Sequence, residues 1–398
     1  MNIQLSDRVS RIKPSPTLAI TARANQLKAA GKDIISLGAG EPDFDTPDHI
    51  KEAAIKAIRS GDTKYTAVDG TPELKLAIEG KFARDNSLVY KNNQILVSCG
   101  GKHSFYNLSQ ALLNAGDEVI IPAPYWVSYP DMVLLADATP VIVATHDDNH
   151  FKMTPEQLEA AITPKTRVVV INSPSNPSGV AYRRAELEAL GEVLLKYPDI
   201  IVATDDMYEH ILWTNEPFCN IVNCCPDLYS RTVVLNGVSK AYSMTGWRIG
   251  YAAGPSRLIQ AMSDIQSQST SNPTSVAQAA AAAALSGDQK CVEEMRVTFK
   301  ERHDYLVTNL NTIDGIRCKP SDGTFYAFPN VEAFIKRLPA DMQVATDLDL
   351  AEFLLVQANV ATVPGSAFGT PGHLRLSFAT SMANLKKALE RIGNINDR

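Results

Sequence analysis

The chain has 398 residues, a length that suits two or three domains, and its 45% hydrophobic and 21% charged residues indicate a globular protein. The 38 Lys and Arg residues against 44 Asp and Glu give a net charge of −6, which argues against a broad nucleic-acid surface because phosphate binding needs clustered cations. No run of about 18 apolar residues predicts a membrane span, and residues 1–13 are too polar for a secretory signal.

The cysteines and histidines predict neither a disulfide scaffold nor a metal site. The chain contains no Cys-x-x-Cys pair, no His-Glu-x-x-His motif and no Cys/His quartet. We interpret the cysteines as free thiols and expect a cytoplasmic protein. They are Cys99, Cys219, Cys224, Cys225, Cys291 and Cys318.

Short apolar, β-branched runs between residues 95 and 253 predict strands. Such continuous runs are typical of strands covered on both faces, as in a parallel sheet. Helix-like stretches lie between them, and the alternation predicts an α/β fold with ligands at the carboxyl ends of the strands. The predicted strands are Ile95–Ser98, Glu118–Pro122, Pro140–Ala144, Arg167–Asn172, Ile200–Thr204, Thr232–Asn236 and Ile249–Ala253. The predicted helices begin near Lys102 and cover Pro155–Ile162 and Arg184–Leu195.

The pattern changes beyond about residue 255. The Ala-rich segment Ala277–Leu285 predicts a helix that continues toward a long helix through Glu293–Leu310. Shorter elements then predict a smaller α+β domain, and the Pro-rich segment Lys13–Pro16 predicts an exposed arm. These shorter elements are strands at Thr324–Phe328, Val360–Val363 and Leu374–Ala379, and helices near Leu348–Gln357 and Leu385–Ile392.

The segment from Leu235 to Gly250 carries the most informative chemistry. Lys240 follows an apolar strand in a loop of small residues, and Arg248 opens the next apolar strand. A partly enclosed lysine can form a Schiff base with an aldehyde, and an arginine can hold a phosphate through two hydrogen bonds. Together they indicate pyridoxal phosphate (PLP), although a lone Lys/Arg pair is more often an ordinary feature of a surface loop.

A series of ordered blocks covers nearly the whole chain and resembles the class I, fold-type I PLP-dependent aminotransferases. The sequence looks closest to the bacterial branch of the aspartate aminotransferases. Each block alone is weakly specific, and their common order makes the resemblance specific. The blocks are Ser36–Pro47, Lys64–Gly70, Gly100–Lys102, Pro124–Pro130, Asn172–Gly179, Thr204–Tyr208, Leu235–Gly250 and His373–Ser377.

The resemblance implies the PLP-transferase fold of type I. This is an α/β fold in which a large domain has a mainly parallel central sheet flanked by helices and a smaller domain is α+β. We expect residues 1–47 to form an N-terminal arm and part of the small domain. Residues 48–296 would form the large PLP-binding domain and residues 297–398 the C-terminal small domain. The family also implies a homodimer with shared active sites.

The family assigns roles around the cofactor ring. Asp205 would face the pyridine nitrogen and keep it protonated. Spacing alone leaves Asp206 equally suitable, and a lone Asp after a strand is often a helix cap. Asn176 and Tyr208 would contact the ring oxygen and favour its ionised form. The resemblance therefore implies Lys240, Asp205 and Tyr208 as the catalytic residues.

Further residues are implied at the ring face and the phosphate. Trp126 would stack on the ring. Gly100 and Gly101 would present backbone N–H groups to the phosphate at a helix N-terminus, where Arg248 also binds, and Lys102 is counted with these cofactor-binding residues. Tyr65 would reach the phosphate of the partner subunit.

The substrate's α-carboxylate would be held by Arg375, which is centred in a predicted strand, and Gly40 would let the backbone approach it. Trp126 and Asn176 are expected to border the substrate as well. The sequence departs from some relatives at Gly237, where they carry a hydroxyl residue that contacts the phosphate.

A second departure concerns the substrate's side-chain carboxylate. Animal and enteric enzymes bind it with an arginine of the partner chain, from the segment that corresponds to Gln266–Ser275, and this segment contains no arginine here. Lys102 is the natural replacement, and Lys13 in the arm could reach an acidic or prephenate-like substrate. Both could instead be solvated surface lysines.

We therefore predict an aspartate aminotransferase that converts L-aspartate and 2-oxoglutarate into oxaloacetate and L-glutamate by a ping-pong cycle through the Lys240 Schiff base. The nearest alternative is an aminotransferase of prephenate or aromatic amino acids, which includes a bifunctional enzyme. A PLP-dependent C–S lyase and a non-enzymatic PLP-binding regulator are further alternatives, but such regulators usually append a DNA-binding module and no spare basic domain is present.

Overall fold

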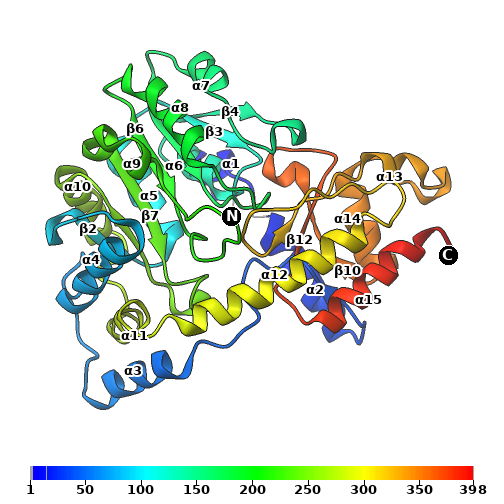
Figure 1. Ribbon diagram of the computed structural model, residues 1–398, viewed down its shortest axis with the longest axis horizontal. Helices are drawn as coiled ribbons and strands as arrows, with labels where there is room; N and C mark the ends of the chain where they lie inside the picture. The colour runs from blue at the N-terminus through cyan, green and yellow to red at the C-terminus, as the bar shows by residue number, and fades with distance from the viewer. Residues whose placement is uncertain (1–2, 15, 398) are drawn as a thin grey trace.

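The computed structural model describes residues 3–14 and 16–397. A large part is built on a seven-stranded sheet, and a smaller part contains a two-stranded and a three-stranded sheet. The expected α/β fold with a mainly parallel central sheet is confirmed. In Figure 1 the large part lies on the left, and on the right lie α2 (Pro16–Ala29), α13 (Glu332–Arg337), α14 (Asp347–Gln357) and α15 (Met382–Gly393).

The central sheet contains all the strands predicted between residues 95 and 253. Its order is β2 (Ile95–Ser98), β8 (Gly250–Ala253), β7 (Thr232–Gly237), β6 (Ile201–Asp205), β5 (Thr166–Asn172), β3 (Glu118–Ala123) and β4 (Thr139–Ala144). Neighbours from β7 to β4 are parallel, whereas β8 is antiparallel to β2 and β7. Residues 238–249 join β7 to β8 without a crossover helix, and a direct connection of this kind favours antiparallel pairing.

Helices cover both faces of this sheet. Along β5, Val168 and Val170 pack into one core, whereas Val169 and Ile171 pack into the other, as the two-residue period of a strand requires. The first core is closed by α5 (Gly101–Leu112), α6 (Ser128–Leu135) and α10 (Ser256–Ser267). The second is closed by α3 (Asp48–Arg59), α4 (Pro72–Asn86), α7 (Pro155–Ala161), α8 (Arg184–Leu195), α9 (Ile221–Cys224) and α11 (Ser275–Ser286).

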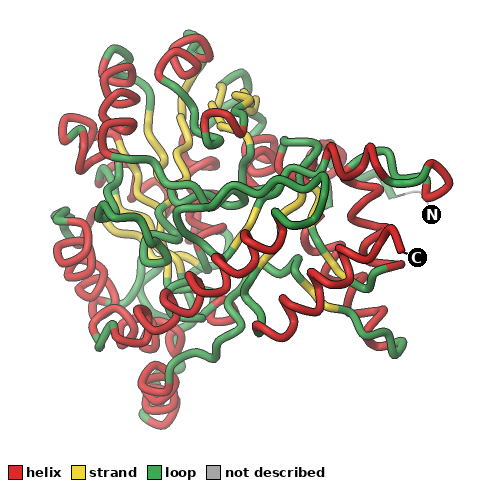
Figure 2. The backbone as a smooth tube through the Cα atoms, turned by 45° about the vertical axis from the view of Figure 1, so that its right-hand side comes forward, coloured by secondary structure: helices red, strands yellow, loops and turns green. Residues whose placement is uncertain are grey.

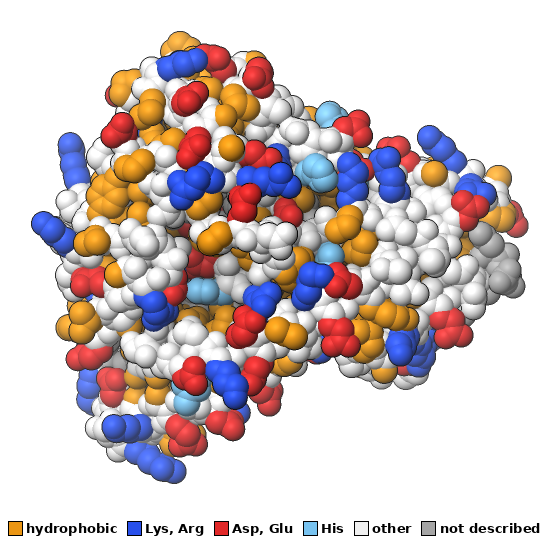
Figure 3. All heavy atoms as spheres, viewed as in Figure 1, with side chains coloured by type: hydrophobic (Ala, Val, Ile, Leu, Met, Phe, Trp, Pro, Cys, Tyr) orange, Lys and Arg blue, Asp and Glu red, His pale blue; other side chains and the backbone are white. Residues whose placement is uncertain are grey.

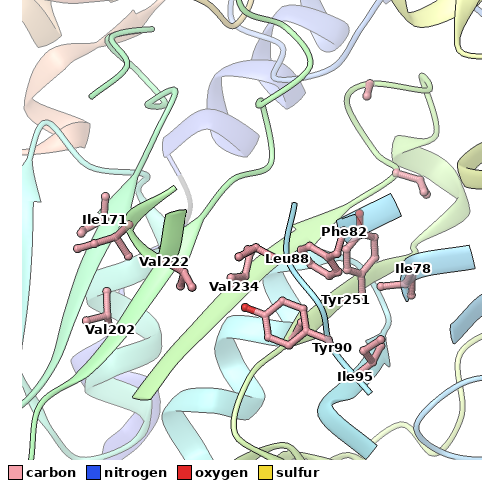
Figure 4. Packing of buried hydrophobic residues seen from close by; sticks show 14 of the residues in the cluster. Ile78, Phe82, Leu88, Tyr90, Ile95, Ile171, Val202, Val222, Val234 and Tyr251 are labelled. Atoms are coloured by element: carbon pink, nitrogen blue, oxygen red, sulfur yellow. The ribbon is translucent and has the colours of Figure 1, made fainter. Parts of the chain in front are cut away.

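The packing of the second core is visible in Figure 4, where Phe82 lies against Tyr251 and Ile171 lies near Val202. In Figure 2 the yellow strands of the large sheet lie inside a shell of red helices. On the face in Figure 3, blue Lys and Arg side chains lie among red Asp and Glu side chains, so this face is mixed in charge.

The long helix α12 (Lys290–Leu310) runs from the side of α11 toward α15 (Figure 1). The sequence predicted one continuous helix through this region, but α11 and α12 are separate. The Gln289 side chain donates hydrogen bonds to the carbonyl oxygens of Ala284 and Gly287, which satisfies backbone groups at the end of α11. The Gln289 side chain therefore stabilises the break between the two helices.

The smaller part has its own core, to which α12 contributes Met295, Phe299 and Leu306. Its three-stranded sheet is antiparallel, and its two-stranded sheet is parallel and pairs residues from both ends of the chain. The strands are β1 (Ile35–Ser36), β9 (Tyr326–Ala327), β10 (Val360–Ala361), β11 (Val363–Pro364) and β12 (Leu374–Ser377).

The N-terminal region contains two helices that the sequence did not predict, α1 (Asp7–Arg11) and α2. Helix α1 lies against α6, where Arg11 pairs with Asp137. Helix α2 packs on β10 and β11 and has a single buried residue, Ala24, so it lacks the apolar stripe that would predict it. Across the described ranges, no helix is both long and apolar enough to cross a membrane.

Candidate active site

A cavity of about 360 Å³ opens at the carboxyl ends of β5 and β6, where the α/β pattern predicts a ligand site. Its lining combines residues of the large sheet with α2, the Gly38–Glu41 loop and β12. Most of the predicted site residues meet here. They are Gly40, Gly101, Lys102, Trp126, Asn176, Asp205, Tyr208, Lys240, Arg248 and Arg375.

Lys240 lies three residues beyond the end of β7, with its amine inside the cavity. Its Nζ donates a hydrogen bond to the Gly40 carbonyl oxygen at 2.6 Å. Burial, assisted by the positive charge of Arg375, lowers the pKa of Lys240 to about 8. The amine therefore loses its proton much more readily than an ordinary lysine does, which suits a nucleophile or a general base.

The two aspartates that the sequence could not separate lie in different surroundings. Asp205 lines the cavity, and its carboxylate accepts hydrogen bonds from the Tyr129 hydroxyl and from the Met207 N–H at 3.2 Å. Asp206 lies away from the cavity and accepts hydrogen bonds from Thr204 and Asn220. Burial raises the pKa of both carboxyl groups, that of Asp206 to about 8. Only Asp205 is placed to meet a ligand.

Arg375 is buried in β12 and reaches the cavity from the small part. Its guanidinium donates to the Asn176 side-chain oxygen at 2.9 Å and to the Gly38 carbonyl at 2.8 Å. The rings of Tyr326 and Phe368 lie 4.4 and 5.0 Å from its central carbon. Its Nε has no hydrogen-bond partner among the described residues, so the fixed cation keeps capacity for an anion.

An anion site is formed where α5 begins. Gly100 has a φ of +91°, and a side chain on it would collide with the Arg248 guanidinium. A side-chain carbon on Gly101 would lie 2.4 Å from Met207. Arg248 is anchored by donating to the Thr245 carbonyl at 2.9 Å. Backbone N–H groups and a guanidinium thus meet at one helix N-terminus, which favours a phosphate.

The departure at Gly237 has a steric reason. A side-chain carbon there would lie 3.0 Å from the Ile249 carbonyl oxygen and 3.1 Å from the Gly250 Cα, so a hydroxyl residue does not fit without a shift. Ser239, which the sequence reasoning passed over, lines the cavity instead.

Lys102 and Trp126 both line the cavity, with the Lys102 Nζ 5.3 Å from the centre of a Trp126 ring. Burial, with the nearby charge of Arg248, lowers the pKa of Lys102. Two predicted residues, Lys13 and Tyr65, are exposed and lie outside the described lining of the cavity. The Lys13 backbone N–H donates to Asp131 at 3.4 Å, and Tyr65 has 90% of its surface exposed.

Several lining or supporting residues were missed by the sequence reasoning. Tyr129 belongs to the quoted block Pro124–Pro130, so its three-residue spacing from Trp126 was an available signal. The Tyr326 hydroxyl lies 2.9 Å from that of Tyr208 and gives this predicted residue a partner inside the protein. Thr17, Leu18 and Thr21 line the cavity from α2, and no local pattern marked them.

Comparison with known proteins identifies the family. Residues 32–392 match the family described as aminotransferase class I and II. The chain belongs to this family. An aspartate/prephenate aminotransferase from Nitrosomonas europaea is 61% identical over 395 residues, which cover 99% of this chain and 100% of that protein. An aspartate aminotransferase from Geobacillus stearothermophilus is 52% identical over 391 residues, 98% of each protein.

Solved structures of aminotransferases have the same fold. An aspartate aminotransferase from Rhizobium meliloti aligns over 100% of both chains with a TM-score of 0.96 and 50% identity. One from Thermus thermophilus with maleate aligns over 99% of this chain and 100% of that one, with a TM-score of 0.91 and 42% identity. The resemblance and the aminotransferase class of enzyme predicted from the sequence are confirmed.

Proposed function

We propose that this aminotransferase uses PLP to move the amino group of L-aspartate to 2-oxoglutarate, giving oxaloacetate and L-glutamate. The observation that carries the proposal is the meeting of Lys240, Asp205 and Arg375 in one cavity, although 170 positions separate Asp205 from Arg375 (375 minus 205). The names of the relatives from Nitrosomonas europaea and Geobacillus stearothermophilus, both of which include aspartate, support the substrate.

The cavity suits a flat aldehyde that carries a phosphate. The start of α5 and Arg248 would hold the phosphate, and the absence of side chains at Gly100 and Gly101 lets Arg248 and Met207 pack against this turn. Trp126 offers a flat face, and Asp205 offers an anion for a ring nitrogen. When bound, the pyridoxal ring supplies an electron sink for the negative charge that develops at the amino acid's α-carbon.

The chain's own residues would then bind the substrate and move its proton. Arg375 would hold the α-carboxylate through its unused hydrogen-bonding capacity, beside the backbone of Gly40. This contact would direct the α-hydrogen toward the Lys240 Nζ, which accepts the proton from the α-carbon. The Tyr129 hydroxyl would hold the Asp205 carboxylate in place, and Tyr326 would do the same for Tyr208.

Specificity for a dicarboxylic acid would come from Lys102. It lies in the same cavity as Arg375, so the two cations can hold the two carboxylates of one short substrate. The structure of the Thermus thermophilus relative was determined with the dicarboxylate maleate, which supports a dicarboxylic substrate. Lys13 is a second candidate cation for acidic substrates, although the described chain places it at the surface.

A second function, amino transfer to prephenate, is favoured by one observation. Leu18 of α2 has 66% of its surface exposed and lines the cavity together with Trp126 and Val127, so part of the wall is apolar. Such a wall can accept a larger ring. The name of the Nitrosomonas europaea relative includes both substrates.

We propose that the enzyme is a cytoplasmic homodimer. Tyr65 has 90% of its surface exposed, whereas tyrosine side chains in proteins are usually partly buried. A contact with the phosphate in the site of a partner subunit would cover this side chain. The six described cysteines are all free thiols, which suits a reducing compartment.

The test is an assay of purified protein with several amino donors, aspartate among them, against 2-oxoglutarate and then against prephenate. We expect aspartate with 2-oxoglutarate to give the highest kcat/KM and the protein to turn yellow with PLP. Release of pyruvate and ammonia from cysteine-type substrates would instead indicate a lyase, and DNA retardation at physiological salt would indicate a regulator. A protein that stays colourless with PLP would refute the proposal.

A further inference from the structure

Two cysteines, Cys219 and Cys224, lie at the two ends of the one-turn helix α9 (Ile221–Cys224). Asn220 caps this helix, so Cys219 is the residue before the cap and Cys224 is the fourth helical residue. Side chains at these two positions pack against each other at helix N-termini. The Asn220 and Asn223 side chains each bond the other's backbone N–H, which fixes the turn that brings the cysteines together.

The two thiols have different chemical roles. The hydrogen bond from the Cys224 thiol, with help from the positive charge of Arg184, lowers the pKa of Cys219 to about 7 despite the opposing effects of burial, Glu216 and Glu188. The same hydrogen bond raises the pKa of Cys224. The shared hydrogen bond thus favours a thiolate at Cys219 beside the Cys224 thiol, an arrangement typical of reactive cysteine pairs.

Cys219 is accessible from a second cavity. Cys219 lies in the wall of a cavity of about 390 Å³, together with Trp213, Glu216 and Phe218. Among the described residues, this cavity and the catalytic cavity share no lining residue. A small reagent can therefore reach Cys219 without entering the catalytic site.

We propose that Cys219 and Cys224 form a reversible, oxidant-sensitive disulfide for which a hydroperoxide is the reagent. The Cys219 thiolate attacks one peroxide oxygen, the O–O bond breaks, and the other oxygen leaves with the electron pair as hydroxide or alkoxide. The Cys224 sulfur then attacks the resulting sulfenic acid, loses its proton and expels hydroxide, so that a disulfide and water form. Two thiols are oxidised by two electrons and the peroxide is reduced.

A peptide-mapping experiment tests this pairing. Trypsin cleaves after Lys196 and Arg231 and releases one peptide that contains Cys219, Cys224 and Cys225. After the cofactor-loaded protein is treated with hydrogen peroxide, we expect this peptide to lose two hydrogen atoms and to regain them with dithiothreitol. Cys225→Ser should behave like the native protein, whereas Cys219→Ser and Cys224→Ser should not form the bond. A bond that includes Cys225, or irreversible oxidation of Cys219 alone, would overturn the proposal.

A second measurement on the native protein does not depend on how the variants fold. Alkylation by iodoacetamide should be faster at Cys219 than at Cys225, whose pKa burial raises. The expected difference at pH 7 is roughly fivefold or more, because the larger thiolate fraction outweighs the lower nucleophilicity of that thiolate. The rate at Cys219 should reach half its maximum near pH 7. A midpoint near 9, or faster reaction at Cys225, would also overturn the proposal.

Discussion

Two buried clusters of charge adjoin the segment that follows β6, and they differ in how completely their groups are paired. In the catalytic cavity the Arg375 Nε has no partner among the described residues, and the Lys240 amine has one hydrogen bond. Behind the cavity, Glu209 pairs with Lys81 and accepts hydrogen bonds from Asn86 and Asn236, each at 2.6 Å. A ligand can complete the first cluster, whereas both oxygens of the Glu209 carboxylate already have partners within the protein.

The pKa values of the two carboxylates show the same contrast. Burial raises the pKa of Asp205, and the hydrogen bonds of Tyr129 and Met207 oppose this only in part. Burial alone would also raise the pKa of Glu209, but Lys81, His210 and Asn86 lower it to about 2. The difference suits a structural role for Glu209 and supports the proposal that Asp205 pairs with a cationic group of a ligand.

The largest expected effect is that of Lys240→Ala. We expect the variant to retain bound cofactor through Arg248 and the α5 terminus but to lose roughly 10⁴-fold or more in transamination, because the covalent anchor and the base disappear together. Aspartate turnover and the cofactor absorbance spectrum measure the two properties separately. Substantial turnover by this variant would remove Lys240 from the mechanism.

Lys81→Ala tests the buried pair of Lys81 and Glu209. It should reduce the free energy of unfolding by about 3–5 kcal/mol, because Glu209 would remain buried without its cation. Denaturant titration of the cofactor-loaded protein measures the loss. Lys387→Ala, which removes a partner of Asp33 at the surface, is the control and should cause no comparable loss. Equal effects of both variants would contradict the distinction between the clusters.

Asp205→Asn and its neighbour Asp206→Asn form a matched pair. The first should lower kcat by roughly 10²–10³-fold, because it removes a preorganised charge from the site. The second should change kcat little, because a pKa of about 8 leaves Asp206 protonated and an amide resembles that form. Steady-state kinetics with aspartate decides between them, and a larger loss in Asp206→Asn would reverse the assignment.

The smallest expected effect is that of Lys102→Ala. For dicarboxylic donors, the fall in kcat/KM should correspond to a loss of about 1–3 kcal/mol in transition-state stabilisation. The loss for a neutral donor should be much smaller. Lys13→Ala is the comparison, because Lys13 lies outside the described lining of the cavity and should have the weaker effect. Equal losses with acidic and neutral donors would reject the role of Lys102.

The sequence by itself determined the strands of the central sheet and the family of the protein. Apolar runs such as Ile95–Ser98 and helices such as Arg184–Leu195 have the predicted bounds because their patterns are local. Lys240 could be singled out as a candidate because its motif is contiguous. Cys219 and Cys224 are also close together in the chain, but the proposal that they pair rests on the cap geometry of α9, which the sequence did not predict.

Only the tertiary structure decided which side chains meet. It separated Asp205 from Asp206, brought Leu18 of α2 into the cavity wall and placed Tyr129 on Asp205. These contacts join residues that are distant in the chain, and their free energy depends on the packing of whole elements, which no local pattern records. A strand's apolar run shows that it is buried, but the sheet and its neighbours decide which end and which face meet the ligand.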